Sequence, residues 1–366
     1  MKKAFVTGVT GQDGAYLSAL LLQKGYRVFG GHRRSSVQNF WRLAELDVLE
    51  HENFSFVEHD LTDFGSNLRA IIDIEPEEIY NLGAQSFVGV SFKEPTATAQ
   101  ISGVGPLQLL EAVRTVNPKI KMYQASSAEM YGKVQAVPQS ETTPFYPRSP
   151  YATAKLFGHW SAVNYREAYG MFVCSGILFN HESPLRGTEF VTRKISKAAA
   201  RISLGREAGL RLGNLDAMRD WGFAGEFVEG MWRMLQAEQP DTYVLATGKA
   251  SKVRDFAVQS FAAAGIDIEW EGKGDAEIGR CAASGRTLIS IDPQFYRPTE
   301  VESLLGDAGK AERVLGWKAT MSVAELAGIM VAADLAREDR PPAAVRKPHT
   351  SERVGSGMMS GAMALR

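Results

Sequence analysis

The segment AFVTGVTGQDGAYLSALLLQKG, residues 4–25, predicts a β-strand, a glycine-rich turn and an α-helix in direct succession. An apolar run precedes the first glycine, and leucines at helical spacing follow the last, up to Gly25, a residue suited to end a helix. The GxxGxxG spacing of Gly8, Gly11 and Gly14 permits a tight turn, close approach of backbone to a pyrophosphate, and packing of helix on strand. Because the helix N-terminus then faces the phosphates, the segment indicates a dinucleotide-binding unit.

Strand and helix patterns continue to alternate after this unit. Five further strands are predicted over residues 26–31, 54–63, 77–86, 119–127 and 171–180, with helices through 68–72, over 96–116 and from 149 onward. This alternation predicts an α/β fold of the Rossmann type, a doubly wound parallel sheet with helices on both faces.

The second strand runs into a basic turn, His32-Arg33-Arg34-Ser35-Ser36. An NAD-binding fold usually carries an acidic residue here for the ribose 2′-hydroxyl, whereas two arginines and two hydroxyls suit a 2′-phosphate. The turn therefore predicts NADP as cofactor, with an exposed basic turn as the alternative. We expect Asp60, at the end of the third strand, to contact the adenine. We expect the small residues of 82–86 to lie near the nicotinamide, although an ordinary small-residue turn would look the same.

SSAEMYG (126–132) and SPYATAK (149–155) bring together the groups of an acid–base site. Ser149 is a good helix N-cap and Pro150 suits the first helical position, so Tyr151 and Lys155 should project from one helix face. A lysine cation beside the phenol should lower its pKa from about 10 and make Tyr151 a usable acid–base group. The alternative is a half-buried tyrosine and a solvated lysine.

Composition narrows the class of protein. The chain has 366 residues, 45% of them hydrophobic, and a net charge of −1, which indicates neither a nucleic-acid surface nor a polybasic membrane surface. Cys174 and Cys281 form no CxxC pair, so neither a disulfide framework nor a metal site is implied. No apolar run reaches membrane-spanning length, and we expect a soluble, cytoplasmic protein.

The pattern changes after residue 180. A polar link (180–187) leads into a basic amphipathic helix, and Arg186, Arg193, Lys194, Arg219 and Arg297 recur on the surrounding loops. Solvated charges would explain several of them, but their concentration predicts a smaller domain that holds a phosphorylated ligand. We expect a cofactor domain over 1–180 and a substrate domain over 181–340, with some strands and helices crossing back. Residues 341–366, rich in Pro, Gly and Ser, should form a flexible tail.

Longer sequence motifs indicate a particular protein family. The chain resembles the extended short-chain dehydrogenases/reductases and, within them, the GDP-mannose 4,6-dehydratase family. The matching motifs occur in the same order as in the family, from residue 5 to about 317: TGVTGQDGAYL, HRRSS, HDLTD, YNLGAQS, YGKVQ, TTPFYPRSPY, ILFNHESPLRG, FVTRKIS, LGNLDAMRDWGF, YRPTEV and LLGD. NHESPLRG and GNLDAMRDWG are not general to short-chain dehydrogenases, so they carry the specificity.

The resemblance implies a redox-neutral lyase that acts on GDP-mannose with NADP, as a homotetramer with the Arg33–Ser36 loop at a subunit contact. It implies four catalytic residues: Ser127, Glu129, Tyr151 and Lys155. It implies cofactor contacts from Gly8, Thr10, Gly11, Gln12, Asp13, Gly14, Arg33, Arg34, Ser35, Ser36, Asp60, Leu61, Leu82, Gly83, Ala84, Gln85, Ser86, Tyr151, Lys155, His181 and Arg186. Substrate contacts are implied for Ser86, Ser127, Glu129, Asn180, Lys194, Arg219 and Arg297.

The chemistry of the residues agrees with this implication. Dehydrating a hexose needs a base for the C5 proton and an acid for the C6 hydroxyl, and one carboxyl can serve both in turn. Glu129 is the only carboxylate in its motif, although a glutamate at a strand end is also common as a surface charge or helix cap. Two positions depart from the family: Phe87 replaces a histidine, and Ser127 replaces a threonine and keeps its hydroxyl.

Two other classes of function stay open on sequence grounds. A nucleotide-sugar 4-epimerase or a 4-keto-sugar reductase would share the glycine turn and the Tyr-Lys pair without needing a base at Glu129. A non-catalytic NADP-sensing module is the other, and it is disfavoured because such proteins commonly lose the Tyr or the Lys.

Overall fold

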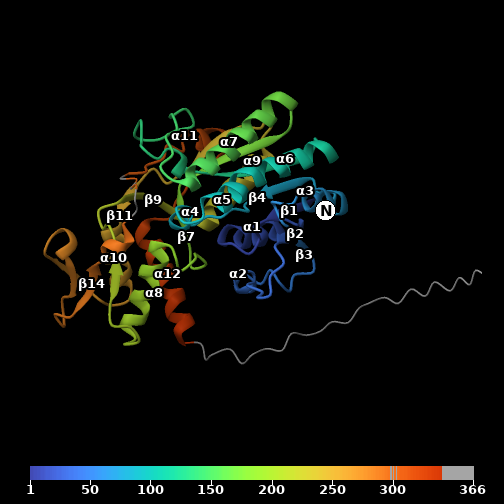
Figure 1. Ribbon diagram of the computed structural model, residues 1–366. Helices are drawn as coiled ribbons and strands as arrows, with labels where there is room; N and C mark the ends of the chain where they lie inside the picture. Colours follow the sequence, from blue (N-terminus) through green and yellow to red (C-terminus); the bar gives the residue numbers. More distant parts are fainter. Residues whose placement is uncertain (297–298, 300, 302, 340–366) are drawn as a thin grey trace, which may run out of the picture.

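The main sheet of the protein is parallel and seven-stranded, with strand order β10-β6-β5-β4-β1-β2-β3. The computed structural model describes residues 1–296, 299, 301 and 303–339 (Figure 1). The strands are β1 (Lys3–Thr7), β2 (Arg27–His32), β3 (Phe54–Glu58), β4 (Glu78–Asn81), β5 (Lys121–Ser127), β6 (Val173–Leu178) and β10 (Thr242–Leu245). This sheet confirms the predicted doubly wound α/β fold, and strand order reverses between β1 and β4, where such folds bind ligands.

Helices cover both faces of the sheet. On one face lie α3 (Phe64–Ile74), α5 (Pro95–Ala99), α6 (Gly105–Val116) and α7 (Pro150–Tyr169), with the short α4 (Val88–Ser91) against α7. On the other lie α1 (Gln12–Gln23), α2 (Trp41–Glu45), α9 (Ala224–Gln236) and α11 (Gly309–Leu315). Residues of β1 alternate between the two layers: Ala4 and Val6 pack under α1 and α9, whereas Phe5 packs under α3 and α6.

A smaller lobe lies to one side of the main sheet (Figure 1). One sheet of the lobe contains β8 (Leu210–Leu212), β12 (Ile268–Glu271), β13 (Ile278–Cys281) and β14 (Thr287–Ile291), and the other contains β7 (Asn180–Glu182), β9 (Met218–Phe223) and β11 (Ala250–Lys252). Its helices are α8 (Val191–Ser203), α10 (Val253–Ala263) and α12 (Val323–Asp339). Ile195, Phe256 and Met330 from these helices share one apolar core. Three segments after residue 180, α9, β10 and α11, belong to the larger unit, and the predicted tail over 341–366 lies outside the described residues.

Two predicted strands were too long, and one predicted helix is present but irregular. The helix expected over 96–116 is three consecutive pieces, α5, a π-turn over Gln100–Val104, and α6. Pro106 lacks the N–H that would bond to Ser102, which explains why the regular ladder breaks there. The strands expected over 54–63 and 77–86 end at Glu58 and Asn81.

The strand expected over 171–180 ends at Leu178. Asn180–Glu182, part of the predicted polar link, forms β7 instead and pairs with β9 in the smaller lobe. The chain therefore passes from one lobe to the other directly after the main sheet. Within the described residues, none of the helices is both long enough and apolar enough to cross a bilayer.

Candidate active site

The glycine turn lies at the carboxyl edge of the main sheet, against the tip of β4. Gly8 has a φ of +65°, and a Cβ there would come within 2.9 Å of the Gly83 amide nitrogen. At Gly14 a Cβ would come within 2.6 Å of the Val9 Cα, so only glycine lets α1 pack this closely on the turn. The turn thus has the shape that was predicted for close approach of backbone to a phosphate group.

Thr7, a residue outside the predicted site, joins β1 to β4. Its hydroxyl accepts hydrogen bonds from the backbone N–H groups of Leu82 and Gly83 at 3.1 and 3.0 Å and donates to Asn81 Oδ1 at 2.6 Å. It thereby holds the small-residue segment 82–86 next to the glycine turn. Its place immediately before the GxxGxxG motif was the only available signal.

Gln12, Asp13 and His181, all predicted cofactor residues, lie together and connect α1 to β7. Gln12 Nε2 donates to the His181 carbonyl at 3.1 Å, and its Oε1 accepts from the Ser183 hydroxyl at 2.7 Å. Asp13 Oδ2 lies 2.9 Å from His181 Nε2. The structure therefore uses these polar side chains to join the glycine-turn helix to the start of the smaller lobe.

The contacts of His181 favour its charged form. Its Nε2 faces the Asp13 carboxylate and its Nδ1 faces the Phe179 carbonyl at 2.7 Å, so both ring nitrogens meet acceptors. Burial works against the charge, but Asp13 outweighs it and raises the pKa of His181 above 6.5. For Asp13, burial is likewise outweighed by His181, and its pKa falls to about 2.

This pair predicts a pH dependence of stability. A histidine whose folded pKa exceeds 6.5 stabilises the protein below that pH, and the contribution is lost as pH rises through the folded value. The melting temperature of the wild type should therefore fall as pH rises above 6.5 and through the folded pKa of His181. In the Asp13→Asn variant the raising effect of the carboxylate is lost, so burial should bring the pKa of His181 below 6.5. The fall in melting temperature should then disappear. Differential scanning calorimetry measures it, with the exposed Asp73→Asn as control; equal slopes in all three proteins would contradict the prediction.

The predicted 2′-phosphate loop, Arg33–Ser36, is exposed beyond β2. Asp60 accepts hydrogen bonds from the backbone N–H and hydroxyl of Thr62 at 2.9 and 2.7 Å. Burial opposes ionisation of Asp60, but these bonds and the Arg33 charge lower its pKa. The loop and the carboxylate thus lie close enough to interact electrostatically.

Arg186 follows β7 and lies close enough to Asp13 for its charge to lower the pKa of that carboxyl. Its Nε is 3.0 Å from Glu182 Oε2, and its guanidinium lies 3.5 Å from the Phe190 ring centroid. Phe87, the residue that replaces the family histidine, packs edge-on against Phe190 with centroids 5.9 Å apart. An apolar contact therefore occupies the position at which the family carries a polar ring.

Arg42 is a further residue that the sequence did not indicate. Its guanidinium donates to the Thr10 carbonyl at 3.2 Å and to the Leu185 carbonyl at 2.7 Å. It joins the glycine turn to the segment that carries Arg186. Arg42 belongs to none of the recognised motifs, and only the folded chain brings these partners together.

The helix that carries the Tyr-Lys pair begins as predicted. Ser149 accepts a hydrogen bond from the Ala152 N–H, and Pro150 occupies the first turn of α7. Tyr151 and Lys155 are both buried, with Lys155 Nζ 5.9 Å from the Tyr151 ring centroid. Lys155 Nζ donates to the Ala125 carbonyl at 3.0 Å, and so anchors α7 to the end of β5.

The expected lowering of the Tyr151 pKa by Lys155 is wrong for the protein without bound ligands. Burial raises the pKa of Tyr151 to about 12; a hydrogen bond with Ser127 lowers it, and the Glu129 charge raises it. Burial also lowers the pKa of Lys155 to about 8. Burial thus disfavours the charged forms of both groups, and for Tyr151 it is the dominant effect.

Ser127 and Glu129 complete the cluster. Ser127 ends β5, and its hydroxyl accepts from the Glu129 backbone N–H at 3.2 Å in the 3-10 turn Ala128–Met130. The Glu129 side chain is nine-tenths buried and influences Tyr151 electrostatically. The four predicted catalytic residues therefore meet at the carboxyl end of β5.

The predicted substrate residues are more dispersed. Asn180 lies in β7, Ser86 is exposed beyond β4, and Arg219 lies buried in β9, where it donates to the Met218 carbonyl at 2.8 Å. Lys194 lines a basic cleft in the smaller lobe. Arg297 lies outside the described residues.

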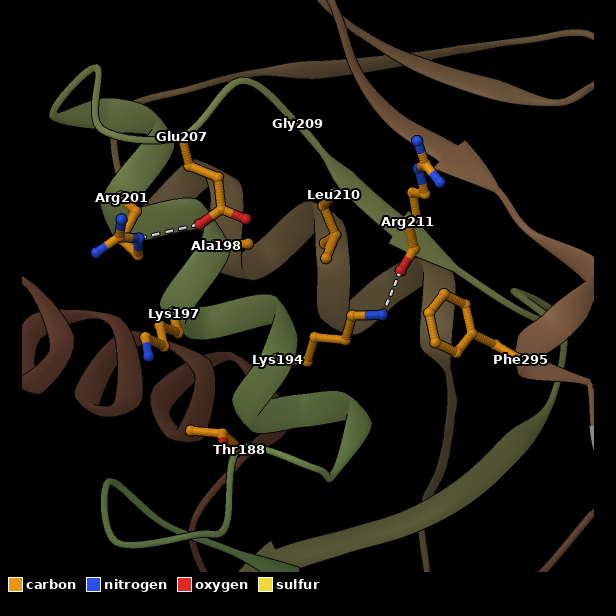
Figure 2. Close-up of a pocket in the computed structure, with 10 residues that line it drawn as sticks. All are labelled: Thr188, Lys194, Lys197, Ala198, Arg201, Glu207, Gly209, Leu210, Arg211 and Phe295. Carbon is orange, nitrogen blue, oxygen red and sulfur yellow. Dashed lines mark hydrogen bonds and ion pairs between the residues drawn. The ribbon is translucent and has the colours of Figure 1, made fainter. Parts of the chain in front are cut away.

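The basic cleft has a volume of about 770 Å³ (Figure 2). It is lined by Thr188, Lys194, Lys197, Ala198, Arg201, Glu207, Gly209, Leu210, Arg211 and Phe295. Lys194 Nζ donates to the Arg211 carbonyl at 2.6 Å and lies 3.5 Å from the Phe295 ring centroid, while Arg201 pairs with Glu207 at 3.0 Å. The basic amphipathic pattern of α8 was the sequence signal for this surface. In the described part of the chain, no three His, Cys, Asp or Glu side chains group as metal ligands would.

The doubly wound sheet, the glycine turn at its switch point and the Ser-Tyr-Lys cluster define an extended short-chain dehydrogenase/reductase. Comparison with known proteins narrows this class. The family model described as GDP-mannose 4,6 dehydratase matches residues 5–330. The chain belongs to the GDP-mannose 4,6-dehydratase family.

Individual relatives agree with this assignment. The chain is 52% identical to GDP-mannose 4,6 dehydratase 2 of Caenorhabditis elegans, over 94% of this chain and 91% of that one. It is also 52% identical to the GDP-mannose 4,6-dehydratase of Yersinia enterocolitica, over 92% and 94% of the two chains. Among solved structures, the UDP-glucose 4-epimerase of Bifidobacterium longum superposes with a TM-score of 0.77 at 20% identity, over 92% of this chain and 99% of that one. RMD of Pseudomonas aeruginosa superposes with a TM-score of 0.73 at 22% identity, over 92% and 100%. At these identities the structures support the fold alone.

Proposed function

We propose that this protein converts GDP-mannose to GDP-4-keto-6-deoxymannose, with NADP carrying the hydride internally. The observation that supports it most is the buried Glu129 carboxylate next to the Ser127–Tyr151 hydrogen bond. Epimerases and reductases need the Tyr-Lys pair but no second acid–base group. Dehydration needs one, and Glu129 lies where it could serve.

The residues divide the proton transfers between them. Tyr151 takes the proton of the C4 hydroxyl as C4 is oxidised. NADP⁺, when bound, would supply the hydride acceptor and a positive charge that favours the phenolate. The resulting 4-keto group acidifies the C5 proton, which Glu129 removes. Glu129 then protonates the C6 hydroxyl, which departs as water with Ser127 donating a hydrogen bond. Bound NADP would also supply the hydride for C6, and transfer to C5 of the proton that Tyr151 took completes a redox-neutral loss of water.

The test is product analysis of GDP-mannose incubated with the purified protein. We expect the 4-keto-6-deoxy product by mass spectrometry, with no net NADPH by absorbance. One NADPH for each sugar consumed would mean a simple dehydrogenase, and a GDP-hexose of unchanged mass would mean an epimerase. No turnover with tight NADPH binding would mean a non-catalytic module.

We infer that the cofactor is NADP rather than NAD, because two arginines follow β2 and the Arg33 charge reaches the Asp60 carboxylate. Arg33→Ala combined with Arg34→Ala should weaken NADPH binding by about 10- to 100-fold and NADH binding much less, since charge-assisted bonds to a 2′-phosphate are lost. Fluorescence titration with both nucleotides measures the difference. Arg27→Ala, at the opposite end of β2, is the control, and equal losses for NADPH and NADH would assign the arginines a structural role only.

We infer that residues 1–180, together with α9 and β10, bind the cofactor and that the smaller lobe binds the nucleotide sugar. The basic cleft has a volume within the range of small-molecule sites, and Lys194 at its centre suits a diphosphate. Lys194→Ala should raise KM for GDP-mannose about tenfold and leave NADPH affinity unchanged. Steady-state kinetics check this against the exposed control Lys318→Ala. An unchanged KM would place the diphosphate elsewhere.

We also propose that the protein assembles as a homotetramer. Phe157 and Trp160 are about half exposed on α7, and the Arg33–Ser36 loop is exposed beyond the main sheet. Exposed aromatic rings on one helix favour contact with a second copy. If the cofactor bridges subunits, light scattering should show a larger species when NADP is added.

A further inference from the structure

Tyr151, Lys155 and His159 recur every four residues along α7, and each contacts one of three consecutive residues of β5. The Tyr151 hydroxyl bonds with Ser127, Lys155 Nζ donates to the Ala125 carbonyl, and His159 Nδ1 lies 3.0 Å from Ser126 Oγ. The contact between His159 and Ser126 lies one helical turn beyond Lys155, on the same face of α7. The proposed chemistry makes no use of it.

His159 belongs to a closed polar set with two serines. Its Nδ1 lies 2.8 Å from Ser175 Oγ, and Ser126 Oγ lies 2.8 Å from Ser175 Oγ. All three residues are at least 97% buried, on α7, β5 and β6 respectively. Nδ1 either donates or accepts, so two of the three contacts are hydrogen bonds at any one time. In either tautomer the set joins the helix to both strands.

The surroundings keep the imidazole neutral and fixed. Burial, with a smaller effect of Arg166, lowers the pKa of His159 to about 4. Phe145 and Trp160 pack against the ring edge-to-face, with centroids 5.4 and 5.5 Å away. A neutral ring held this way is suited to orienting its neighbours.

We propose that His159 is a positioning residue for the reaction, which locks α7 to β5 through Ser126 and thereby holds Tyr151 and Lys155 in place beside Ser127. Ser126 lies between Ala125, which anchors Lys155, and Ser127, which bonds to Tyr151. A shift of Ser126 would therefore move both anchors. Displacements of an ångström or less at reacting groups lower rates strongly, so the effect should appear in kcat. This inference rests on the proposed dehydratase activity.

The experiment compares His159→Leu, which removes the ring nitrogens, with His159→Asn, which keeps a polar atom near the Nδ1 position. We expect His159→Leu to lower kcat about tenfold with KM for GDP-mannose and the NADPH dissociation constant within about twofold of wild type. His159→Asn should recover most of the loss, and the exposed control His51→Leu should match wild type. Ser126→Ala should add little to His159→Leu, because both changes break the same contact.

The outcomes separate the inference from the proposed function. An inactive wild type would overturn the function itself. An active wild type with a folded His159→Leu of normal kcat would overturn the positioning role, as would equal losses in the Leu and Asn variants. If His159→Leu does not fold, Ser175→Ala, which removes a single hydroxyl, should lower kcat about threefold at unchanged KM. An unchanged kcat in that variant would overturn the inference.

Discussion

Replacing Glu129 with Gln should lower kcat for product formation by about 10²- to 10⁴-fold, the range for loss of a general acid–base group. Glutamine keeps the size of the side chain and the backbone bond to Ser127, so the fold and the first oxidation step should survive. The C4 hydride can still leave, but the C5 proton has no base. A single turnover should therefore accumulate NADPH and a 4-keto sugar that retains its C6 hydroxyl.

Stopped-flow absorbance and mass spectrometry of quenched samples measure both species. Glu167→Gln, exposed on α7, is the matched control and should behave as wild type. Full turnover in Glu129→Gln would exclude dehydration through this carboxylate and favour an epimerase or a reductase.

Tyr151→Phe should lower the rate of NADPH formation by about 10²- to 10⁴-fold, because it removes the group that takes the C4 hydroxyl proton. The defect precedes that of Glu129→Gln, so this variant should accumulate neither NADPH nor a keto sugar. The side chain is buried and differs from phenylalanine by one oxygen, and the Ser127 hydroxyl is the partner that loses a hydrogen bond.

The same stopped-flow assay tests this, with Tyr169→Phe, exposed at the end of α7, as the control. NADPH affinity should stay within about twofold, which separates lost chemistry from lost cofactor binding. A normal NADPH burst in Tyr151→Phe would mean that another group takes the C4 proton.

Local features were predictable from the sequence because their causes are local. The strand, glycine turn and helix over 4–25 follow from residue spacing and from the backbone freedom of Gly8, whose positive φ the structure bears out. The start of α7 follows from Ser149 and Pro150. An i, i+4 pair must share a helix face, so Tyr151 and Lys155 were placed together before the fold was known.

The tertiary structure decided what burial and distant contacts determine. The pKa of Tyr151 rises to about 12 because the folded chain removes water from the phenol, which the spacing of Tyr151 and Lys155 cannot express. β7 lies outside the main sheet because it pairs with β9. β7 begins at Asn180 and β9 at Met218, 38 residues later, so no local pattern could reveal the pairing. Asp13 meets His181, and His159 meets Ser126 and Ser175, across separations that no local pattern encodes. The sequence by itself determined the fold class and the identity of the reacting groups. The packing of distant segments determined the protonation of those groups and the contacts that hold them in place, because protonation and contacts depend on neighbours that only folding supplies.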